Sequence, residues 1–231
     1  IRDRLRSRGL GDVYKRQGIE EPEGDLYDAI VIDVDGTLLD SEKQISEKTV
    51  ETIVDAQKRG KKIAIASGRS IAGIRKNVAK IQLEKYGGYV IAYNGTTVVN
   101  CKTGECIYNQ MVPGEILSQV YNEAVKSGVA IAVYNDAAKE IIVGNGLNKY
   151  VELDAIACDV AVRESNDFVK TVDFGFNKIL LSGEPDNMKN IEKHMLEMFG
   201  DKVNVFRSDP HFVELLPKYV DKGVAVEKLM R

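Results

Sequence analysis

Two carboxylic acids, Asp33 and Asp35, stand two positions apart at the end of the apolar run formed by residues 27–33. If that run is a buried strand of a parallel sheet, both acids lie at its carboxyl edge, where open α/β sheets bind their ligands. Neighbouring carboxylates repel each other unless a cation balances them, and Mg²⁺ suits oxygen ligands at a site that also receives phosphate. The pair therefore predicts a magnesium and phosphate site.

The residues after the acids favour this interpretation over its simpler alternative, an acidic turn that caps a helix. Gly36 permits a sharp turn away from the strand, and Thr37 can hydrogen-bond locally to hold that turn. A lone Asp-x-Asp would favour the acidic turn. The whole octet 33–40, directly after an apolar strand, favours the site.

The elements that must position the acids are predicted by hydrophobic periodicity. Apolar runs at 27–33, 62–66 and 89–93 are typical of strands buried on both faces of a sheet. Amphipathic patterns at 46–60 and 70–82 predict helices. Alternation of strand and helix predicts an α/β fold with a Rossmann-like parallel-sheet core.

The middle of the chain has a different pattern, which predicts an inserted α+β module. A hairpin precedes Pro113 and Gly114, a natural exit from the first domain, and Pro217 and Gly223 punctuate the return. The elements predicted in between are helices near 115–127 and 187–199, strands near 129–134, 139–143, 177–182, 203–207 and 212–216, and a mixed segment that runs to about 170.

Residues 1–17 are set aside from the domain division. They resemble translated sequencing-adapter read-through, and we expect them to be a non-native artefact; the alternative is a genuine flexible basic arm. The expected domains are then a core formed by residues 24–111 and 208–231, and an inserted domain formed by residues 112–207.

Charge and composition argue against several classes of partner. Without residues 1–17 the chain has 26 basic and 33 acidic residues, a net charge of −7, so no nucleic acid partner is expected. No apolar run approaches the roughly 20 residues that span a bilayer, so no membrane partner is expected. The cysteines Cys101, Cys106 and Cys158 are too few for a disulfide-stapled fold and fit a reducing, cytoplasmic compartment.

The octet that begins at Asp33 and ends at Asp40 resembles the first signature of the haloacid dehalogenase superfamily of phosphohydrolases. A second match supports this resemblance. Ser67-Gly68-Arg69 follows the second apolar run, where that superfamily has a Ser or Thr that binds the transferred phosphoryl group.

A third match, Lys222-Gly223, lies just after the inserted module. The place of the insertion, together with Asn94-Gly95 after the third apolar run, is similar to the Cof-type branch of the superfamily, whose inserted domain is called the cap. Members of that branch mostly dephosphorylate sugar phosphates and related metabolites. The resemblance therefore implies a phosphoric monoester hydrolase.

The resemblance also implies a role for each matched residue. Asp33 would attack phosphorus and form an aspartyl-phosphate, and Asp35 would act as acid and then base, which requires a raised pKa. Mg²⁺ would bind the Asp33 carboxylate and the Asp35 main-chain carbonyl. The implied phosphate-binding residues are Val34, Thr37, Ser67, Gly68 and Lys222. The residues expected to contact substrate are Arg69, Asn94 and His211.

The resemblance stops before the fourth signature of the family, Gly-Asp followed closely by Asn-Asp, which supplies a further acidic magnesium ligand. We expect the chain to be a truncated fragment that is weak or inactive alone. The expected partner is a small phosphorylated metabolite, and the expected assembly is a monomer or weak homodimer. Two rival functions stay open, a sugar phosphomutase and a non-catalytic phosphometabolite-binding module.

Overall fold

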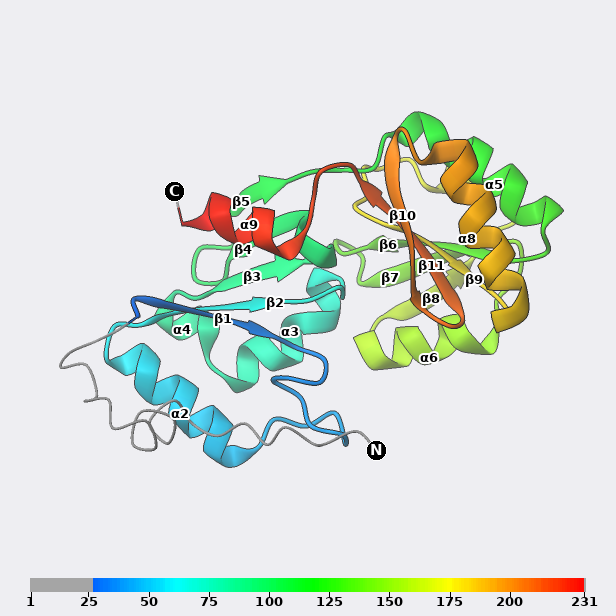
Figure 1. Cartoon of the computed structure of the whole chain (residues 1–231). Helices are drawn as coiled ribbons and strands as arrows, with labels where there is room; N and C mark the ends of the chain where they lie inside the picture. Colours follow the sequence, from blue (N-terminus) through cyan, green and yellow to red (C-terminus); the bar gives the residue numbers. More distant parts are fainter. Residues whose placement is uncertain (1–26, 231) are drawn as a thin grey trace, which may run out of the picture.

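A computed structural model describes residues 27–230, so the predicted artefact at 1–17 and the start of the predicted core at 24 lie outside the described residues. The described chain forms two β-sheets with helices packed against them (Figure 1). The strands of the first sheet, in spatial order, are β1 (Ala29–Asp33), β2 (Lys62–Ala66), β3 (Tyr89–Ala92), β4 (Thr97–Asn100) and β5 (Cys106–Asn109).

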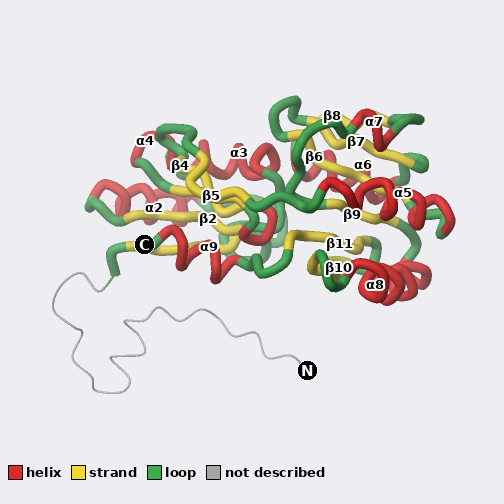
Figure 2. The backbone as a smooth tube through the Cα atoms, turned by 90° about the horizontal axis from the view of Figure 1, so that it is seen from above, coloured by secondary structure: helices red, strands yellow, loops and turns green. Residues whose placement is uncertain are grey.

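The first sheet is parallel in its first three strands. β1 pairs with β2 and β2 with β3 in parallel, whereas β4 and β5 add an antiparallel hairpin. Helices α2 (Glu47–Lys58) and α3 (Ile71–Lys80) lie on one face, and α9 (Lys222–Leu229) lies on the other (Figure 1, Figure 2). A short helix, α4 (Leu83–Tyr86), precedes β3. This arrangement confirms the predicted α/β class with a Rossmann-like core.

The two crossover helices begin at serine caps and bury one face each. Ser46 accepts a hydrogen bond from the amide of Thr49 at the start of α2, and Ser70 accepts one from the amide of Gly73 at the start of α3. The buried side chains of α3 include Ile74, which packs in the same apolar cluster as β2. No helix within residues 27–230 is long and apolar enough to cross a bilayer.

The second sheet has the order β10-β11-β9-β6-β7-β8. Its strands are β6 (Ala130–Asn135), β7 (Glu140–Gly144), β8 (Ala161–Glu164), β9 (Ile179–Ser182), β10 (Val203–Asp209) and β11 (Phe212–Pro217). Helices α5 (Leu117–Lys126) and α8 (Pro185–Phe199) cover one face, and α6 (Lys149–Cys158) lies on the other (Figure 1, Figure 2). The short helix α7 (Phe168–Thr171) packs on the side of α5.

Alternate side chains of β6 belong to two different apolar clusters. Ile131 and Val133 pack in the cluster that contains α5 and α8. Ala132 and Tyr134 belong to a second cluster, which continues into the first sheet and includes Ile65 of β2. Because successive side chains of a strand point to opposite faces, the second sheet is buried on both sides, and one apolar cluster joins the two sheets.

The structure corrects the expected environment of the first strand. Within the described residues β1 is an edge strand, and its side chains Ile30 and Val31 are 40% and 39% exposed. The prediction of burial on both faces is therefore wrong for this strand. An apolar run indicates a strand, but it does not by itself distinguish an edge strand from a central one.

The strand pairing bears on where the inserted domain ends. The expected division returns to the core at residue 208, whereas β10 pairs with β11 and β11 pairs with β9 in the second sheet. We propose that the inserted domain extends to Pro217. The segment expected to be mixed contains α6, whose Leu153 and Ile156 are 62% and 74% exposed, so its apolar residues do not follow one helical face.

Candidate active site

The ends of β1, β2 and β3 meet at one edge of the first sheet. Asp33 ends β1 opposite Ala66 of β2, and Ser67 follows directly. The amide of Ser67 donates to the carbonyl of Ile91, and the amide of Asn94 donates to the carbonyl of Ser67, each at 2.9 Å. The parallel register therefore brings Asp33, Ser67 and Asn94 to the same edge.

The chain turns sharply after Asp33, and main-chain hydrogen bonds hold the turn. The amide of Leu38 donates to the carbonyl of Asp33 at 3.0 Å, and the amide of Leu39 donates to the carbonyl of Val34 at 2.9 Å. Gly36 has a φ of +78°, a conformation that glycine enters without a Cβ penalty. The side chain of Val34 is fully buried and anchors the turn to the core.

Lys222 reaches this edge from the first turn of α9. The carboxylate of Asp221 caps the helix by accepting a hydrogen bond from the amide of Val224 at 2.7 Å. The ammonium group of Lys222 donates to Oδ1 of Asp33 in an ion pair. Residues from the beginning and the end of the described chain thus meet at one point.

Gly95 allows α9 to approach the sheet edge this closely. It ends the 3₁₀ turn η1 (Tyr93–Gly95) with a φ of +104°, and a Cβ at this position would overlap the main-chain carbonyl of Asp221. Only glycine combines this conformation with this contact. Gly95 is therefore a structural requirement for the position of Lys222.

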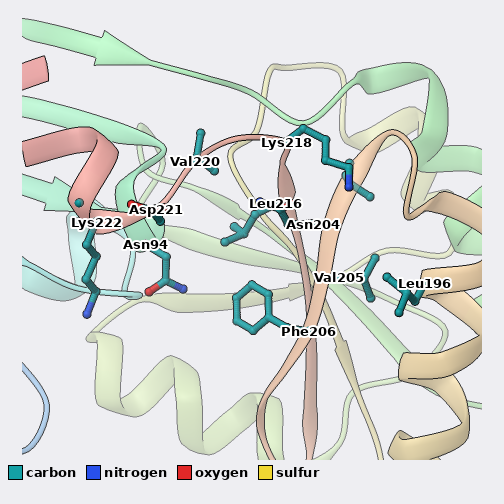
Figure 3. A pocket seen from close by; sticks show the side chains of 12 residues that line it. Asn94, Leu196, Asn204, Val205, Phe206, Leu216, Lys218, Val220, Asp221 and Lys222 are labelled. Carbon is teal, nitrogen blue, oxygen red and sulfur yellow. The ribbon is translucent and has the colours of Figure 1, made fainter. Parts of the chain in front are cut away.

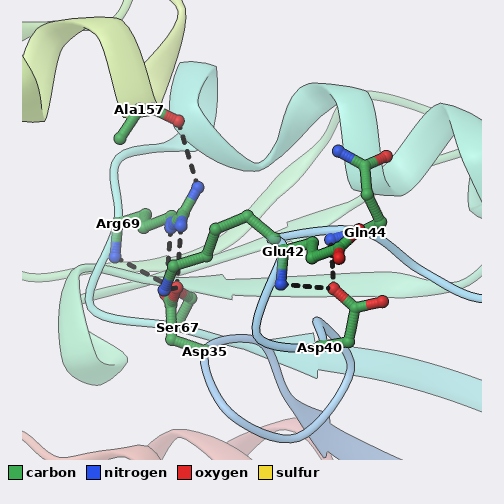
Figure 4. A network of polar contacts seen from close by, with 8 residues as sticks. Asp35, Asp40, Glu42, Gln44, Ser67, Arg69 and Ala157 are labelled. Atoms are coloured by element: carbon green, nitrogen blue, oxygen red, sulfur yellow. Dashed lines mark hydrogen bonds and ion pairs between the residues drawn. The ribbon is translucent and has the colours of Figure 1, made fainter.

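Asp35 has two cationic partners, Arg69 (Figure 4) and Lys43. Arg69 donates from Nε to Oδ2 at 2.9 Å and from Nη2 to Oδ1 at 2.7 Å, and Nζ of Lys43 lies 3.0 Å from Oδ1. Burial raises the pKa of Asp35, but the hydrogen bonds from Arg69 and Lys43 outweigh it and leave the pKa below its ordinary value of 3.8. The raised pKa expected for this residue is therefore not what this arrangement produces.

Arg69 also connects the loop that follows β2, residues 67–69, to the inserted segment (Figure 4). Its main-chain amide donates to Oγ of the buried Ser67 at 3.1 Å, and its Nη1 donates to the carbonyl of Ala157 in α6 at 3.1 Å. The guanidinium group therefore links Asp35 of the first domain to the edge of the second.

Like Asp33, Ser67 and Lys222, the predicted residues Thr37 and His211 are not among the described residues that line the cavity that holds Asp35. Thr37 lines a separate hollow beside α2. His211 stacks on Tyr150 with ring centroids 3.7 Å apart, and it is not among the described residues that line the Asp35 cavity.

The cavity that holds Asp35 has a volume of about 350 Å³ and lies between the two sheets. From the first domain it is lined by Asp35, Lys43, Gly68 and Arg69. The polar side chains that line it from the second sheet and its helices are Tyr134, Asp154, Lys178, Ser208, Asp209 and Glu214. Sequence reasoning missed this second set. Lys178 and Glu214 could have been found, because each is a charged residue within or beside an apolar run that predicts a buried strand: KILLS for Lys178 and FVELLP for Glu214.

A larger hollow, of about 690 Å³, lies beside Lys222 but lacks both acids of the predicted site. It is bounded by β10, β11 and the start of α9, and its apolar side chains include Phe206 and Leu216 (Figure 3). Among the described residues, neither Asp33 nor Ser67 lines this hollow or the Asp35 cavity.

The donor set at Asp33 and Asp35 fits a magnesium ion only in part. Within residues 27–230 no group of three or more His, Cys, Asp or Glu residues could hold a metal ion. The Asp33 carboxylate and the Asp35 main-chain carbonyl are hard oxygen donors. They fit Mg²⁺, which usually keeps several waters and is often held by one or two carboxylates together with substrate phosphate.

Comparison with known proteins identifies similar chains. The sequence model of the family described as haloacid dehalogenase-like hydrolase matches residues 30–231. The crystal structure of a haloacid dehalogenase-like hydrolase from Bacteroides thetaiotaomicron is 33% identical, with a TM-score of 0.85 over 88% of this chain and 76% of that one. TM0651 from Thermotoga maritima is 29% identical, with a TM-score of 0.73 over 88% of this chain and 74% of that one. The HMP-PP phosphatase of Shigella flexneri is 23% identical over 208 residues, which are 85% of this chain and 70% of that protein.

Proposed function

The chain belongs to the haloacid dehalogenase-like hydrolase family, and we propose that it is a cytoplasmic, magnesium-dependent phosphatase of small phosphate monoesters such as sugar phosphates. The observation that carries the proposal is the convergence of Asp33, Ser67 and Lys222 at the carboxyl edge of the first sheet. These residues supply a carboxylate nucleophile, a hydroxyl donor and a cation. Covalent phosphoryl transfer uses a nucleophile, and donors and cations around it stabilise the charge of the transferred group.

Asp33 supplies the attacking oxygen. Its bond to phosphorus forms as the bond between phosphorus and the alcohol oxygen breaks, which leaves the phosphoryl group on the carboxylate. Water then attacks phosphorus, releases inorganic phosphate and restores Asp33. Lys222, already paired with Asp33, would place its positive charge beside the transferred group, and the hydroxyl of Ser67 would donate to a phosphoryl oxygen.

Asp35 would give a proton to the leaving alcohol oxygen and later take one from the attacking water. Its ion pairs with Arg69 and Lys43 favour the ionised form, which suits the second task. For the first task the carboxylate has to be released from these partners when substrate enters. We propose that Arg69 is the partner that moves, because its guanidinium group holds both oxygens of Asp35.

The Asp33 carboxylate and the Asp35 main-chain carbonyl would hold Mg²⁺, with the substrate phosphate and water as further ligands. When bound, the ion neutralises negative charge on the phosphoryl oxygens. The main-chain amides of Val34 and Gly68 would add donors to the same oxygens.

The test is hydrolysis of p-nitrophenyl phosphate with Mg²⁺ by a chain that also carries the fourth signature, combined with chemical trapping of the intermediate. Asp33→Asn should lower the rate by about a thousandfold or more, because the amide cannot act as the nucleophile. Borohydride reduction of the parent during turnover, followed by mass spectrometry, should convert Asp33 to homoserine.

Asp55→Asn is the matched control, since Asp55 is a partly exposed acid on α2 that pairs with Arg59. It should keep the parental rate. Equal rates in Asp33→Asn and the parent would sink the nucleophile assignment. Phosphate binding without a trapped adduct would instead indicate the non-catalytic binding module.

A further inference from the structure

A second cavity, of about 360 Å³, is bounded by α3, by the loop of residues 39–45 and by the end of α6; we call it the α3 cavity. Lys43 and Arg69 line both this cavity and the Asp35 cavity. Among the described residues, neither Asp33 nor Asp35 lines the α3 cavity. It therefore shares a wall with the proposed catalytic region but contains neither of the acids that the proposed function uses.

The α3 cavity has more cations than carboxylates. The cationic side chains that line it are Lys43, Arg69, Lys76 and Lys80. Two carboxylates, Asp35 and Asp159, are ion-paired with three of these cations. The fourth, Lys80, donates to the main-chain carbonyl of Ile45 at 2.8 Å. Among the described residues, four cations against two carboxylates leave an excess of positive charge that would attract an anion.

Two of the cations come from one face of α3. Lys76 and Lys80 are four positions apart, on the face where Gly73 and Asn77 also line the cavity. Residues at this spacing are neighbours on a helix, so two lysines there repel each other at a cost to helix stability. An anion bound between them would remove this cost. A phosphate group fits this arrangement, because its oxygens accept charge-assisted hydrogen bonds from several donors at once.

A third cation, Lys43, is presented by a tight turn (Figure 4). Oδ1 of Asp40 accepts hydrogen bonds from the amides of Glu42 and Gln44, each at 2.9 Å. Lys43 lies between them with a φ of +59°, which is uncommon for a residue with a Cβ. Such a conformation persists only where its surroundings hold it. Asp40 therefore fixes the turn that brings this ammonium group to the cavity.

The α3 cavity also has an apolar part. Ile156 of α6 lines it together with the buried side chains of Leu39 and Ile45. Ile156 is 74% exposed, so a large apolar side chain at the cavity faces water. A ligand that has an apolar ring as well as an anionic group would cover it. The volume is near the lower end of the range for small-molecule pockets, about 300–1,000 Å³, which suits one small molecule.

We propose that the α3 cavity binds a small phosphate ester that carries an apolar ring, the chemistry of a nucleoside monophosphate. Lys76 and Lys80 bind its phosphate group, and Ile156 contacts its base. The ligand is bound here and not hydrolysed, so the site goes beyond the proposed function. Because Lys43 and Arg69 line both cavities, the ligand also competes with Asp35 for these two cations.

The first test is calorimetry on the 231-residue chain, with adenosine 5′-monophosphate as the probe and EDTA in place of Mg²⁺. The double variant Lys76→Gln with Lys80→Gln should weaken binding by about tenfold or more, because two charge-assisted hydrogen bonds are lost. The matched control is Lys170→Gln with Lys193→Gln, which removes the same charge from exposed lysines that pair with acids elsewhere and do not line the cavity. It should stay within about twofold of the parental affinity.

The second test examines the apolar part of the cavity. Ile156→Ala should weaken adenosine 5′-monophosphate by about tenfold, because apolar contact area is lost, and should leave the affinity for inorganic phosphate within about twofold. Leu153→Ala is the matched control, since Leu153 is 62% exposed on the same helix and does not line the cavity. The control should leave both affinities at the parental values.

Ser67→Ala separates the α3 cavity from the proposed catalytic site, because Ser67 lines only the sheet edge and should leave adenosine 5′-monophosphate binding unchanged. If Ser67→Ala weakens this ligand and the Lys76 and Lys80 variant does not, the ligand occupies the catalytic site; the inference is then overturned and the proposed function stands. Equal weakening in the double variant and its matched control would indicate unspecific charge attraction and would overturn the inference. A parent chain that does not bind the nucleotide overturns it as well.

Discussion

Asp35 shares one carboxylate between the guanidinium group of Arg69 and the ammonium group of Lys43. Both partners favour the ionised form, which can accept a proton but has none to give. In the proposed mechanism, loss of the Arg69 contact is the change that lets Asp35 take up the proton that it gives to the alcohol oxygen.

Arg69→Met should raise the pKa of Asp35 relative to the parent. Burial raises this pKa, and the substitution removes the hydrogen bonds that oppose it. Because the lowered folded pKa stabilises the parent above the ordinary value of 3.8 and this stability is lost as the pH falls through the folded value, the variant should lose less stability on acidification. Carbon NMR titration of the carboxyl group measures the pKa.

Lys76→Met is the control for this titration, because Lys76 pairs with Asp159 at 3.0 Å and is not a partner of Asp35. It should leave the pKa of Asp35 unchanged. An Asp35 pKa in Arg69→Met equal to that of the parent would show that the guanidinium group does not determine its protonation.

At the scale of elements, the position of Lys222 depends on the close packing of α9 against η1. The Asp221 cap fixes where the helix begins, and Gly95 fixes how near it comes to the sheet edge. Neither residue touches substrate in the proposed mechanism, yet both determine where the cation lies.

Gly95→Ala should destabilise the fold by about 2 kcal/mol or more and lower kcat, because the new Cβ strains a positive φ and displaces the start of α9. Gly104→Ala is the matched control, since Gly104 has a φ of +72° and nothing within 4 Å of the added Cβ. The control should lose about 1 kcal/mol, from strain alone, and keep its kcat. Urea unfolding and p-nitrophenyl phosphate hydrolysis measure the two effects; equal losses in both variants would contradict the packing argument.

The sequence predicted elements well where local signals agree. Helices α2 and α3 have both periodicity and serine caps, and the β4–β5 hairpin has a clear turn. Helix α6 was missed because its apolar residues do not follow one helical face. The edge position of β1 was missed because one apolar run does not indicate which strands pair with it. The elements were predictable to the extent that their causes are local.

At the scale of the whole molecule, polar bridges fasten the second sheet to the first. Asp136, in the turn between β6 and β7, accepts hydrogen bonds from the amide of Ala72 at 2.9 Å and the hydroxyl of Tyr93 at 2.7 Å. Lys178 and Arg69 make further bridges. Asp33, Ser67 and Lys222 could be proposed from the sequence because they match motifs next to predicted elements. The contacts of Lys178 and Glu214 with Gly68 and Asn94 could not, because they depend on how the two sheets dock.

The Lys178–Glu214 pair should make stability fall at high pH. Burial alone would lower the pKa of Lys178, but the carboxylates of Glu214 and Asp154 raise it above its ordinary value of 10.5. A raised folded pKa gives stability that is complete below the unfolded pKa and is lost as the pH rises through the folded value, so the loss should come above about pH 10.5.

Urea unfolding between pH 9 and pH 12 would measure this loss, on the order of a kcal/mol for each unit of pKa shift. The control is the double variant Lys178→Met with Glu214→Gln, which removes both charges and should show a shallower fall. Identical slopes in the parent and the double variant would contradict a contribution from this pair.

The apolar cluster that contains Ile65 of β2 also contains Ala132 and Tyr134 of β6. At these residues the two sheets are therefore in direct apolar contact. Separating the two sheets would expose this cluster to water, at a free-energy cost of roughly 25 cal/mol for each Å² of apolar surface. A wide hinged opening is therefore an uphill motion. We expect solutes to enter and leave the Asp35 cavity through local side-chain motions at its opening. We expect the two domains to move together as one rigid body.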